Sequence, residues 1–133
     1  MKMLRYIELK SGFNDDGPAW IGYVTPSKTG RTLYFNGRAL LKLKGQRRGS
    51  DGGNYCDMET RESFWVSGVK KNREDRHWAG TGKVIVEAAA LPEYLAIIAP
   101  APLNPRYKVS DSIGPTDIGK FTALANAKLA DRQ

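Results

Sequence analysis

The fold is decided by the stretch Glu62-Ser63-Phe64-Trp65-Val66-Ser67-Gly68-Val69-Lys70-Lys71-Asn72-Arg73-Glu74-Asp75-Arg76-His77-Trp78-Ala79-Gly80, with Lys83-Val84-Ile85-Val86-Glu87 just beyond it. It contains two of the three tryptophans, the only histidine and the densest run of mixed charge. Aromatic and β-branched residues at both ends favour strands, whereas residues 71–76 have the polar composition of a chain reversal. We therefore predict a hairpin with its charged side chains at the tip.

Other segments with the composition of strands lie on both sides of this hairpin. Apolar and polar residues alternate, with aromatic and β-branched residues among them, at residues 3–10, 19–25, 31–36 and 83–87. Residues 38–44 fit a strand slightly better than a short helix, and a turn is expected at residues 57–61. Residues 45–53 are rich in glycine and charge and are predicted to form an exposed loop.

After residue 87 the sequence changes character. Residues 88–99 predict a helix with Pro92 and Glu93 in its first turn, where a missing N–H costs nothing and an acid suits the helix dipole. Three prolines then predict a linker or extended strap at residues 99–106. A second helix is expected from residue 115, with a cap at Thr116 or Asp117 and an apolar stripe of Ile118, Phe121, Leu124, Ala125 and Leu129. It is expected either to pack on the core or to dock on a second copy or a partner.

Together these elements predict a mainly β fold with minor α content. The expected architecture is a small, strongly bent antiparallel sheet or SH3-like barrel of five to six strands, closed by the helix near residues 91–98. Residues 1–99 are expected to form this domain, and residues 100–133 a Pro-rich strap and the C-terminal helix. The core is predicted to contain Tyr6, Ile7, Trp20, Ile21, Leu33, Phe35, Trp65, Val66, Trp78, Val84, Ile85, Leu95 and Ile98.

Composition places the chain among ordinary globular proteins. Its 133 residues suffice for one domain with a real core, and 41% hydrophobic and 26% charged residues are close to the average of soluble domains. The longest apolar run, residues 88–99, is interrupted by Pro92 and Glu93 and is too short to span a bilayer, so no membrane partner is expected. The lone Cys56 cannot form an internal disulfide, and no charged-then-apolar leader opens the chain, so a cytoplasmic location is expected.

An excess of positive charge indicates anionic partners. The net charge is +7 and the pI is near 9.6, and counterion release rewards Lys and Arg side chains placed against phosphates. No acidic residue lies between Asp16 and Asp51, and the predicted hairpin tip is also cationic. We therefore predict a non-enzymatic binding module whose basic face meets nucleic acid or an acidic protein partner. The candidate binding residues are Arg31, Arg38, Lys42, Lys44, Arg47, Arg48, Lys70, Lys71, Arg73, Arg76 and His77.

A small enzyme is the alternative from another functional class. Its candidate catalytic groups are Asp57, Glu59, Glu62 and His77. Paired carboxylates can act as acid and base when their environments separate their pKa values. The use that we expect for these carboxylates is instead a solvated face opposite Arg61 and Lys70, or equally the acidic half of a salt-bridged barrel wall. The chain has one Cys and one His without the spacing of a catalytic pair or a zinc site, and residues 80–83 lack the flanking residues of a P-loop. No metal or cofactor is therefore expected.

The tetrapeptide Asp75-Arg76-His77-Trp78 has a structural and a functional interpretation. In the structural one, Trp78 belongs to the core, Asp75 and Arg76 pair across the turn, and His77 points outward. In the functional one, Arg76 and His77 join the neighbouring cations on a rim with exposed aromatic side chains. Such a rim suits single-stranded nucleic acid, because bases stack on the aromatic faces while phosphates meet the cations.

Four segments also resemble a group of small, uncharacterised bacterial proteins. They are Trp20-Ile21-Gly22, Tyr34-Phe35-Asn36-Gly37, Trp65-Val66-Ser67-Gly68-Val69-Lys70-Lys71 and Asp75-Arg76-His77-Trp78-Ala79-Gly80. The resemblance covers residues 3–97 and implies a compact, stand-alone bacterial domain. It implies neither an activity nor functional residues.

Overall fold

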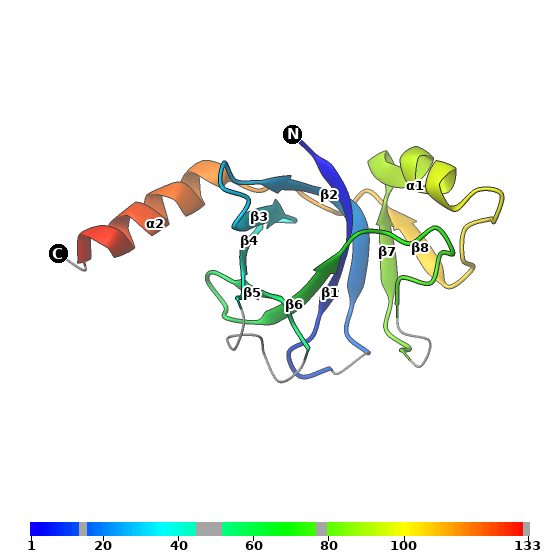
Figure 1. The fold of residues 1–133 in the computed structure, drawn as a ribbon, viewed down its shortest axis with the longest axis horizontal. Coiled ribbons are helices and arrows are strands. Elements are labelled where there is room, and N and C mark those ends of the chain that lie inside the picture. Colours follow the sequence, from blue (N-terminus) through cyan, green and yellow to red (C-terminus); the bar gives the residue numbers. More distant parts are fainter. Residues whose placement is uncertain (14–15, 45–51, 77–79, 132–133) are drawn as a thin grey trace.

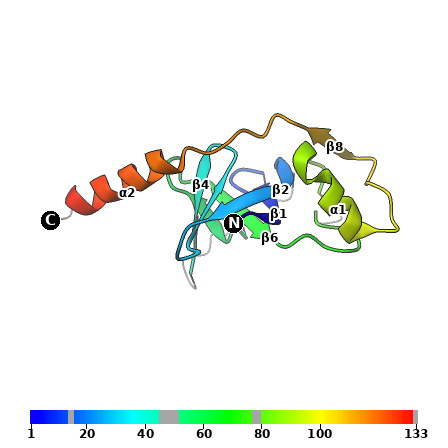
Figure 2. The same ribbon diagram turned by 90° about the horizontal axis from the view of Figure 1, so that it is seen from above.

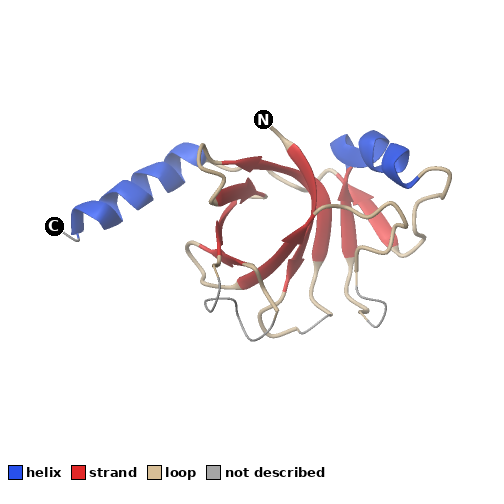
Figure 3. Cartoon of the chain, viewed as in Figure 1, coloured by secondary structure: helices blue, strands red, loops and turns tan. Residues whose placement is uncertain are grey.

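A closed ring of antiparallel strands forms the body of the protein (Figure 1). The computed structural model describes residues 1–13, 16–44, 52–76 and 80–131. Within these ranges the ring consists of six strands, namely β1 (Met3–Leu9), β2 (Ala19–Pro26), β3 (Thr32–Phe35), β4 (Arg38–Lys42), β5 (Tyr55–Asp57) and β6 (Ser63–Ser67). They are neighbours in the order β1-β6-β5-β4-β3-β2, and the pairing of β1 with β2 closes the ring. Helices are a minor part of the chain (Figure 3), so the predicted small, mainly β barrel is confirmed.

Two further strands extend the sheet beyond the barrel. β7 (Val84–Glu87) pairs in parallel with residues 19–21 of β2, and β8 (Tyr107–Ser110) pairs in parallel with β7. β2 therefore changes partners along its length, from β7 at its start to β3 at residues 25–26. This change of partner is where the extension branches from the barrel.

Gly22 lies in β2 between these two sets of partners. A Cβ at this position would come within 2.9 Å of a carboxylate oxygen of Glu87 and 3.0 Å of the Phe35 ring. The absence of a side chain leaves room for both, and the same Glu87 oxygen accepts the N–H of Tyr23 at 2.8 Å. The glycine thus allows the barrel and the extension to meet closely.

Apolar side chains pack in two clusters, one inside the barrel and one outside it. β1 contributes to both, because Ile7 and Leu9 face inward whereas Leu4 and Tyr6 face outward. The inner cluster consists of Ile7, Leu9, Val24, Leu33, Phe35, Leu40, Tyr55, Phe64 and Val66. The outer cluster consists of Leu4, Tyr6, Ala19, Ile21, Val84, Val86, Ala90, Tyr94, Ile98 and Tyr107.

A short helix covers the outer cluster. The 3-10 turn η2 (Ala88–Ala90) leads into α1 (Leu91–Ile98), which lies beside β8 and β2 (Figure 2). Tyr94 and Ile98 are one turn apart and are buried, whereas Leu95 points outward and is 36% exposed. The predicted helix is confirmed, but the prediction of Leu95 as a core residue is wrong, because the buried face of the helix runs through Tyr94.

The C-terminal helix α2 (Ile118–Asp131) contacts the barrel through its first turns. Phe121 is buried, with its ring centroid 6.4 Å from that of Tyr34, and Lys120 pairs with Glu59 at 3.2 Å. Asp117 caps the helix, since its Oδ1 accepts the N–H of Lys120 at 3.1 Å. Beyond this contact the helix extends away from the barrel (Figures 1 and 2).

The hairpin predicted at residues 62–80 is not formed. β6 pairs with β1 and β5, whereas β7 pairs with β2 and β8, so the two strands are not neighbours. The composition of the sequence correctly predicted where both strands lie, but it did not predict which strands they pair with. Val84 and Val86 are buried in the outer cluster, which only the β2 side of the barrel offers, and this long-range packing decides the pairing.

Two strands were not predicted. β5 has three residues, which are too few for an alternating pattern. The residues that follow β5 form the predicted turn, in which Arg61 donates its N–H to the carbonyl oxygen of Asp57 at 3.0 Å. β8 follows the prolines of the expected strap.

The division of the chain at residue 99 stays a prediction, although β8 belongs to the same sheet as β7.

Most of the predicted core residues are buried. Trp20, Trp65 and Ile85 are half-buried, and the two tryptophans pack against the clusters. Trp78 lies outside the described residues. In the part of the chain that the structure describes, no helix is both long and apolar enough to cross a membrane.

Candidate functional site

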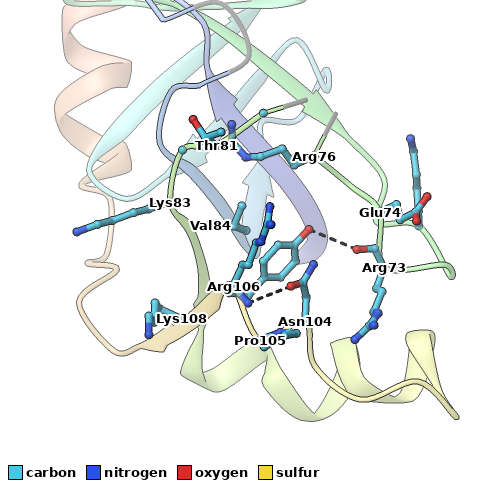
Figure 4. Close-up of a pocket in the computed structure, with 14 residues that line it drawn as sticks. Arg73, Glu74, Arg76, Thr81, Lys83, Val84, Asn104, Pro105, Arg106 and Lys108 are labelled. Atoms are coloured by element: carbon cyan, nitrogen blue, oxygen red, sulfur yellow. Dashed lines mark hydrogen bonds between the residues drawn. The ribbon is translucent and has the colours of Figure 1, made fainter. Parts of the chain in front are cut away.

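A pocket of about 790 Å³ lies where β7 and β8 begin (Figure 4). Because these strands are parallel, the loops that precede them meet at one edge of the sheet, and the loop after β6 completes the wall. The lining residues are Lys70, Arg73, Glu74, Arg76, Gly80, Thr81, Gly82, Lys83, Val84, Asn104, Pro105, Arg106, Tyr107 and Lys108. In Figure 4, Lys83 and Lys108 lie on one side of Val84 and Arg106, and Arg73 and Glu74 lie on the other.

The lining of this pocket, which we name the basic pocket, is strongly positive. Six of its side chains are cationic, and Glu74 is the one carboxylate among them. The cations that form no ion pair with any described residue are Lys70, Arg73, Lys83, Arg106 and Lys108. The like charges repel one another, and a single lining carboxylate offsets this repulsion only in part, so the binding of an anion relieves it. The basic pocket is therefore suited to an anionic ligand.

Two of the arginines are held in place by carbonyl oxygens. Arg73 Nη1 donates to the carbonyl oxygen of Pro102 at 2.8 Å, and the Tyr107 hydroxyl donates to the carbonyl oxygen of Arg73 at 3.4 Å. Arg76 is 9% exposed, and its Nη2 donates to the carbonyl oxygen of Gly17. A neutral acceptor restricts a guanidinium without cancelling its charge. Arg73 is therefore both fixed and available to an anion.

The loop before β7 is held by a carboxylate. Asp16 Oδ1 accepts the N–H and the hydroxyl of Thr81, at 2.9 and 3.0 Å. Gly82 leaves no space for a side chain, since a Cβ there would clash with the carbonyl oxygens of Asp16 and Gly17. The N–H of Thr81 is thus already occupied, and residues 80–83 form a packed turn rather than a cradle of backbone N–H groups for phosphate.

The loop before β8 is ordered by Asn104. Its side-chain oxygen accepts the N–H of Arg106 at 3.0 Å, and its carbonyl oxygen accepts the N–H of Tyr107 at 2.9 Å. This turn redirects the chain after the prolines and starts β8. It places Arg106 and Lys108 on either side of the buried Tyr107.

Asp75 lies inside the protein, beside the pocket rather than in its lining. Its Oδ1 accepts the N–H of Lys70 at 2.6 Å, and the Tyr94 hydroxyl donates to its Oδ2 at 3.4 Å. Burial raises the pKa of Asp75, and these hydrogen bonds offset that effect only in part. Among the described residues Asp75 forms no ion pair, so the predicted pairing of Asp75 with Arg76 is wrong.

The structure divides the predicted basic residues among several places. Those that line the basic pocket are Lys70, Arg73 and Arg76. Those that are exposed elsewhere are Arg31, Lys42, Lys44 and Lys71. Those that lie outside the described residues are Arg47, Arg48 and His77.

The candidate catalytic carboxylates form ion pairs on the barrel. Arg38 Nη1 lies 2.7 Å from Asp57 Oδ2 and 3.1 Å from Glu62 Oε1, and Glu59 pairs with Lys120 of α2. None of the three carboxylates lines the basic pocket. Their arrangement is that of a salt-bridged barrel wall, one of the two uses expected from the sequence.

Three cations of the pocket were not among the predicted binding residues: Lys83, Arg106 and Lys108. They lie at the starts of β7 and β8, and Arg106 follows Lys83 by 23 positions in the sequence. A basic residue on each side of Tyr107 was a local signal of a cationic site. The prolines before Tyr107 led instead to the prediction of a linker. Only the parallel pairing of β7 with β8 brings these residues to Lys70 and Arg73.

Cys56 is half-buried in β5, and its Sγ donates to the carbonyl oxygen of Asp57 at 3.5 Å. Within the described ranges, no group of three or more His, Cys, Asp or Glu side chains is arranged to hold a metal ion.

Comparison of the chain with protein-family models, with curated proteins and with solved structures found no match. The resemblance to small bacterial proteins therefore stays a prediction, and the functional argument depends on the basic pocket itself.

Proposed function

We propose that the protein is a non-enzymatic binding module that takes single-stranded nucleic acid at the basic pocket. The observation that carries the proposal is the gathering of six cationic side chains around one concavity, five of them without an ion pair among the described residues. Arginine forks match phosphate oxygens in geometry and charge. The half-buried Cys56 suits the reducing cytoplasm that we infer as the location.

The other walls of the basic pocket support nucleic acid over a purely acidic protein segment. Pro105 offers an exposed apolar surface beside the largely buried Val84 and Tyr107, and Asn104 and Thr81 add polar atoms. An unpaired nucleotide presents a base and a sugar as well as a phosphate, so it uses both kinds of wall. The volume also lies within the range that holds such a ligand.

The test is fluorescence anisotropy with labelled single- and double-stranded oligonucleotides at about 50 and about 200 mM salt. We expect the affinity for the single strand to fall steeply with salt, with a log–log slope of about −0.7 for each phosphate contacted. No binding of any strand near physiological salt would contradict the proposal. Binding of acidic peptides in its place would assign the pocket to a protein partner.

A matched pair of charge reversals locates the binding. Lys83→Glu/Lys108→Glu acts on the basic pocket, whereas Lys42→Glu/Lys44→Glu makes the same change in charge on exposed residues outside it. None of these four side chains is in an ion pair with a described residue. We expect a loss of affinity at least about tenfold larger for the first variant. Equal losses would show that net charge, and not the pocket, carries the binding.

A second candidate function is assembly through α2. The helix contacts the barrel through Lys120 and Phe121 in its first turns, and its ribbon then extends away from the barrel (Figures 1 and 2). A second copy of the chain is the partner that we propose, and the test is light scattering of the full chain and of a chain ending at Asp117. A dimer that becomes a monomer on truncation is expected, and identical monomeric masses would contradict this role.

A further inference from the structure

The basic pocket gathers cations from three segments of the chain around one concavity. On the basis of the nucleic-acid binding proposed above, we infer that it holds the terminal phosphate of a strand. The protein would then recognise ends that carry a phosphate monoester. The ligand chemistry is a phosphate monoester attached to a nucleoside.

The number of cations exceeds what an internal phosphate requires. An internal phosphodiester carries a single negative charge, and successive phosphates are spread along the strand, whereas a phosphate monoester carries about −1.5 to −2 and three terminal oxygens at neutral pH. Five cationic side chains that form no ion pair with any described residue line one pocket of about 790 Å³. This arrangement matches a compact dianion better than a chain of single charges.

The three arginines are differently constrained. Arg73 and Arg76 are anchored by carbonyl oxygens, which fixes their position before a ligand arrives. The side chain of Arg106 forms no hydrogen bond or ion pair with any described residue and extends between the two sides of the pocket (Figure 4). It is therefore free to close on a phosphate that the anchored Arg73 has oriented.

The rest of the lining fits the nucleoside that carries this phosphate. The apolar lining residues are Val84, Pro105 and Tyr107, of which Pro105 is exposed and the other two are buried in the outer cluster. The side-chain amide nitrogen of Asn104 donates to no described residue and is available to a base or sugar. Inorganic phosphate alone would leave this half of the pocket unused.

The test compares single strands of one sequence that end in a 5′-phosphate, in a 3′-phosphate or in hydroxyls at both ends, with the label at the opposite end. We expect one phosphorylated strand to bind about tenfold more tightly than the hydroxyl strand. A nucleoside monophosphate and inorganic phosphate serve as competitors. The monophosphate is expected to displace the strand at lower concentration than inorganic phosphate, which separates a nucleotide site from a simple anion site.

Arg106→Gln and Arg31→Gln are the matched variants. Both residues are exposed, but only Arg106 lines the basic pocket. Arg106→Gln should abolish the preference for the phosphorylated end while Arg31→Gln keeps it. Equal, salt-dependent binding of all three strands, or an unchanged preference in Arg106→Gln, would overturn the end recognition and leave the proposed function intact. Binding of the monophosphate without binding of any strand would overturn the nucleic-acid function and leave the phosphate site.

Discussion

The hydroxyl of Tyr94, in α1, donates a hydrogen bond to the buried carboxylate of Asp75, in the loop that follows β6. The same carboxylate accepts the N–H of Lys70. Asp75 thereby connects the helix to the loop that carries three cations of the basic pocket. The cost of this connection is a charge inside the protein, which is why the pKa of Asp75 is raised.

Asp75→Asn should keep the acceptor for Lys70 and remove the buried charge. Because the folded-state pKa is raised, the wild type loses stability as the pH rises from about 4, the ordinary value of Asp, through the folded-state pKa. The variant lacks this loss, so at pH 7 it should unfold at the same or a higher temperature. Thermal unfolding across this pH range checks the difference, and equal pH slopes in both proteins would contradict it.

Tyr94→Phe removes the other donor to Asp75 while the ring stays in the outer cluster. We expect a loss of about 1 kcal/mol, the usual contribution of one hydrogen bond. Denaturant unfolding at pH 7 measures it. The loss should shrink in the Asp75→Asn background, where the remaining acceptor is neutral. A full loss there would show that the contribution of the Tyr94 hydroxyl does not depend on the charge of Asp75.

Asp57 is predicted to contribute stability to the barrel at neutral pH that is lost progressively in acid. Burial acts to raise its pKa, but the N–H groups of Thr60 and Glu59 and the Arg38 guanidinium together lower it below its ordinary value. Its contribution is therefore present above about 3.9, the value of an unfolded Asp, and is lost as the pH falls through the folded-state pKa. Asp57→Ala should cost about 2 kcal/mol at pH 7 and clearly less in acid, as measured by urea unfolding.

Glu62→Ala is the control for this ion-pair group. Glu62 also contacts Arg38, but its side chain is 33% exposed, so solvent screens the pair. The variant should lose less than about 1 kcal/mol. A loss as large as that of Asp57→Ala would show that the ion pair, and not the turn that Asp57 holds, carries the stability.

Gly82→Ala should damage the basic pocket through the backbone. The added Cβ would clash with two carbonyl oxygens, so the loop that carries Lys83 must shift. Such overpacking costs about 1 to 3 kcal/mol. Gly68→Ala is the matched control, because a Cβ at Gly68 meets nothing within 4 Å. Melting temperatures of both variants check this, and equal values would contradict the close approach.

Phe121→Ala should release α2 without unfolding the barrel. Phe121 is the side chain of the helix that is buried against Tyr34, and Lys120 adds one exposed ion pair. Limited proteolysis should cut the variant faster within residues 113–131, while the barrel fragment stays intact. Ile7→Ala, in the inner cluster, should instead lower the stability of the whole barrel by about 2 to 5 kcal/mol. Unchanged cleavage of Phe121→Ala would contradict the anchoring role.

Much of the local structure could be predicted from the sequence, because alternation and helical period depend only on neighbours in the chain. The strand at residues 31–36, the helix at residues 88–99 and the capped C-terminal helix are all present in the structure. The excess of positive charge is likewise a property of composition alone. Half of the cationic lining of the basic pocket, namely Lys70, Arg73 and Arg76, was among the predicted residues.

The partners of these elements were decided only by the tertiary structure. β6 and β7 have the composition of a hairpin, yet β7 pairs with β2, because Val84 and Val86 are buried against α1 on that side of the barrel. The pairing of β8 with β7 then brings Arg106 and Lys108 to the cations of a loop more than 30 residues away. Side-chain periodicity specifies which face of a strand is buried, whereas the neighbour that buries it depends on packing between distant segments.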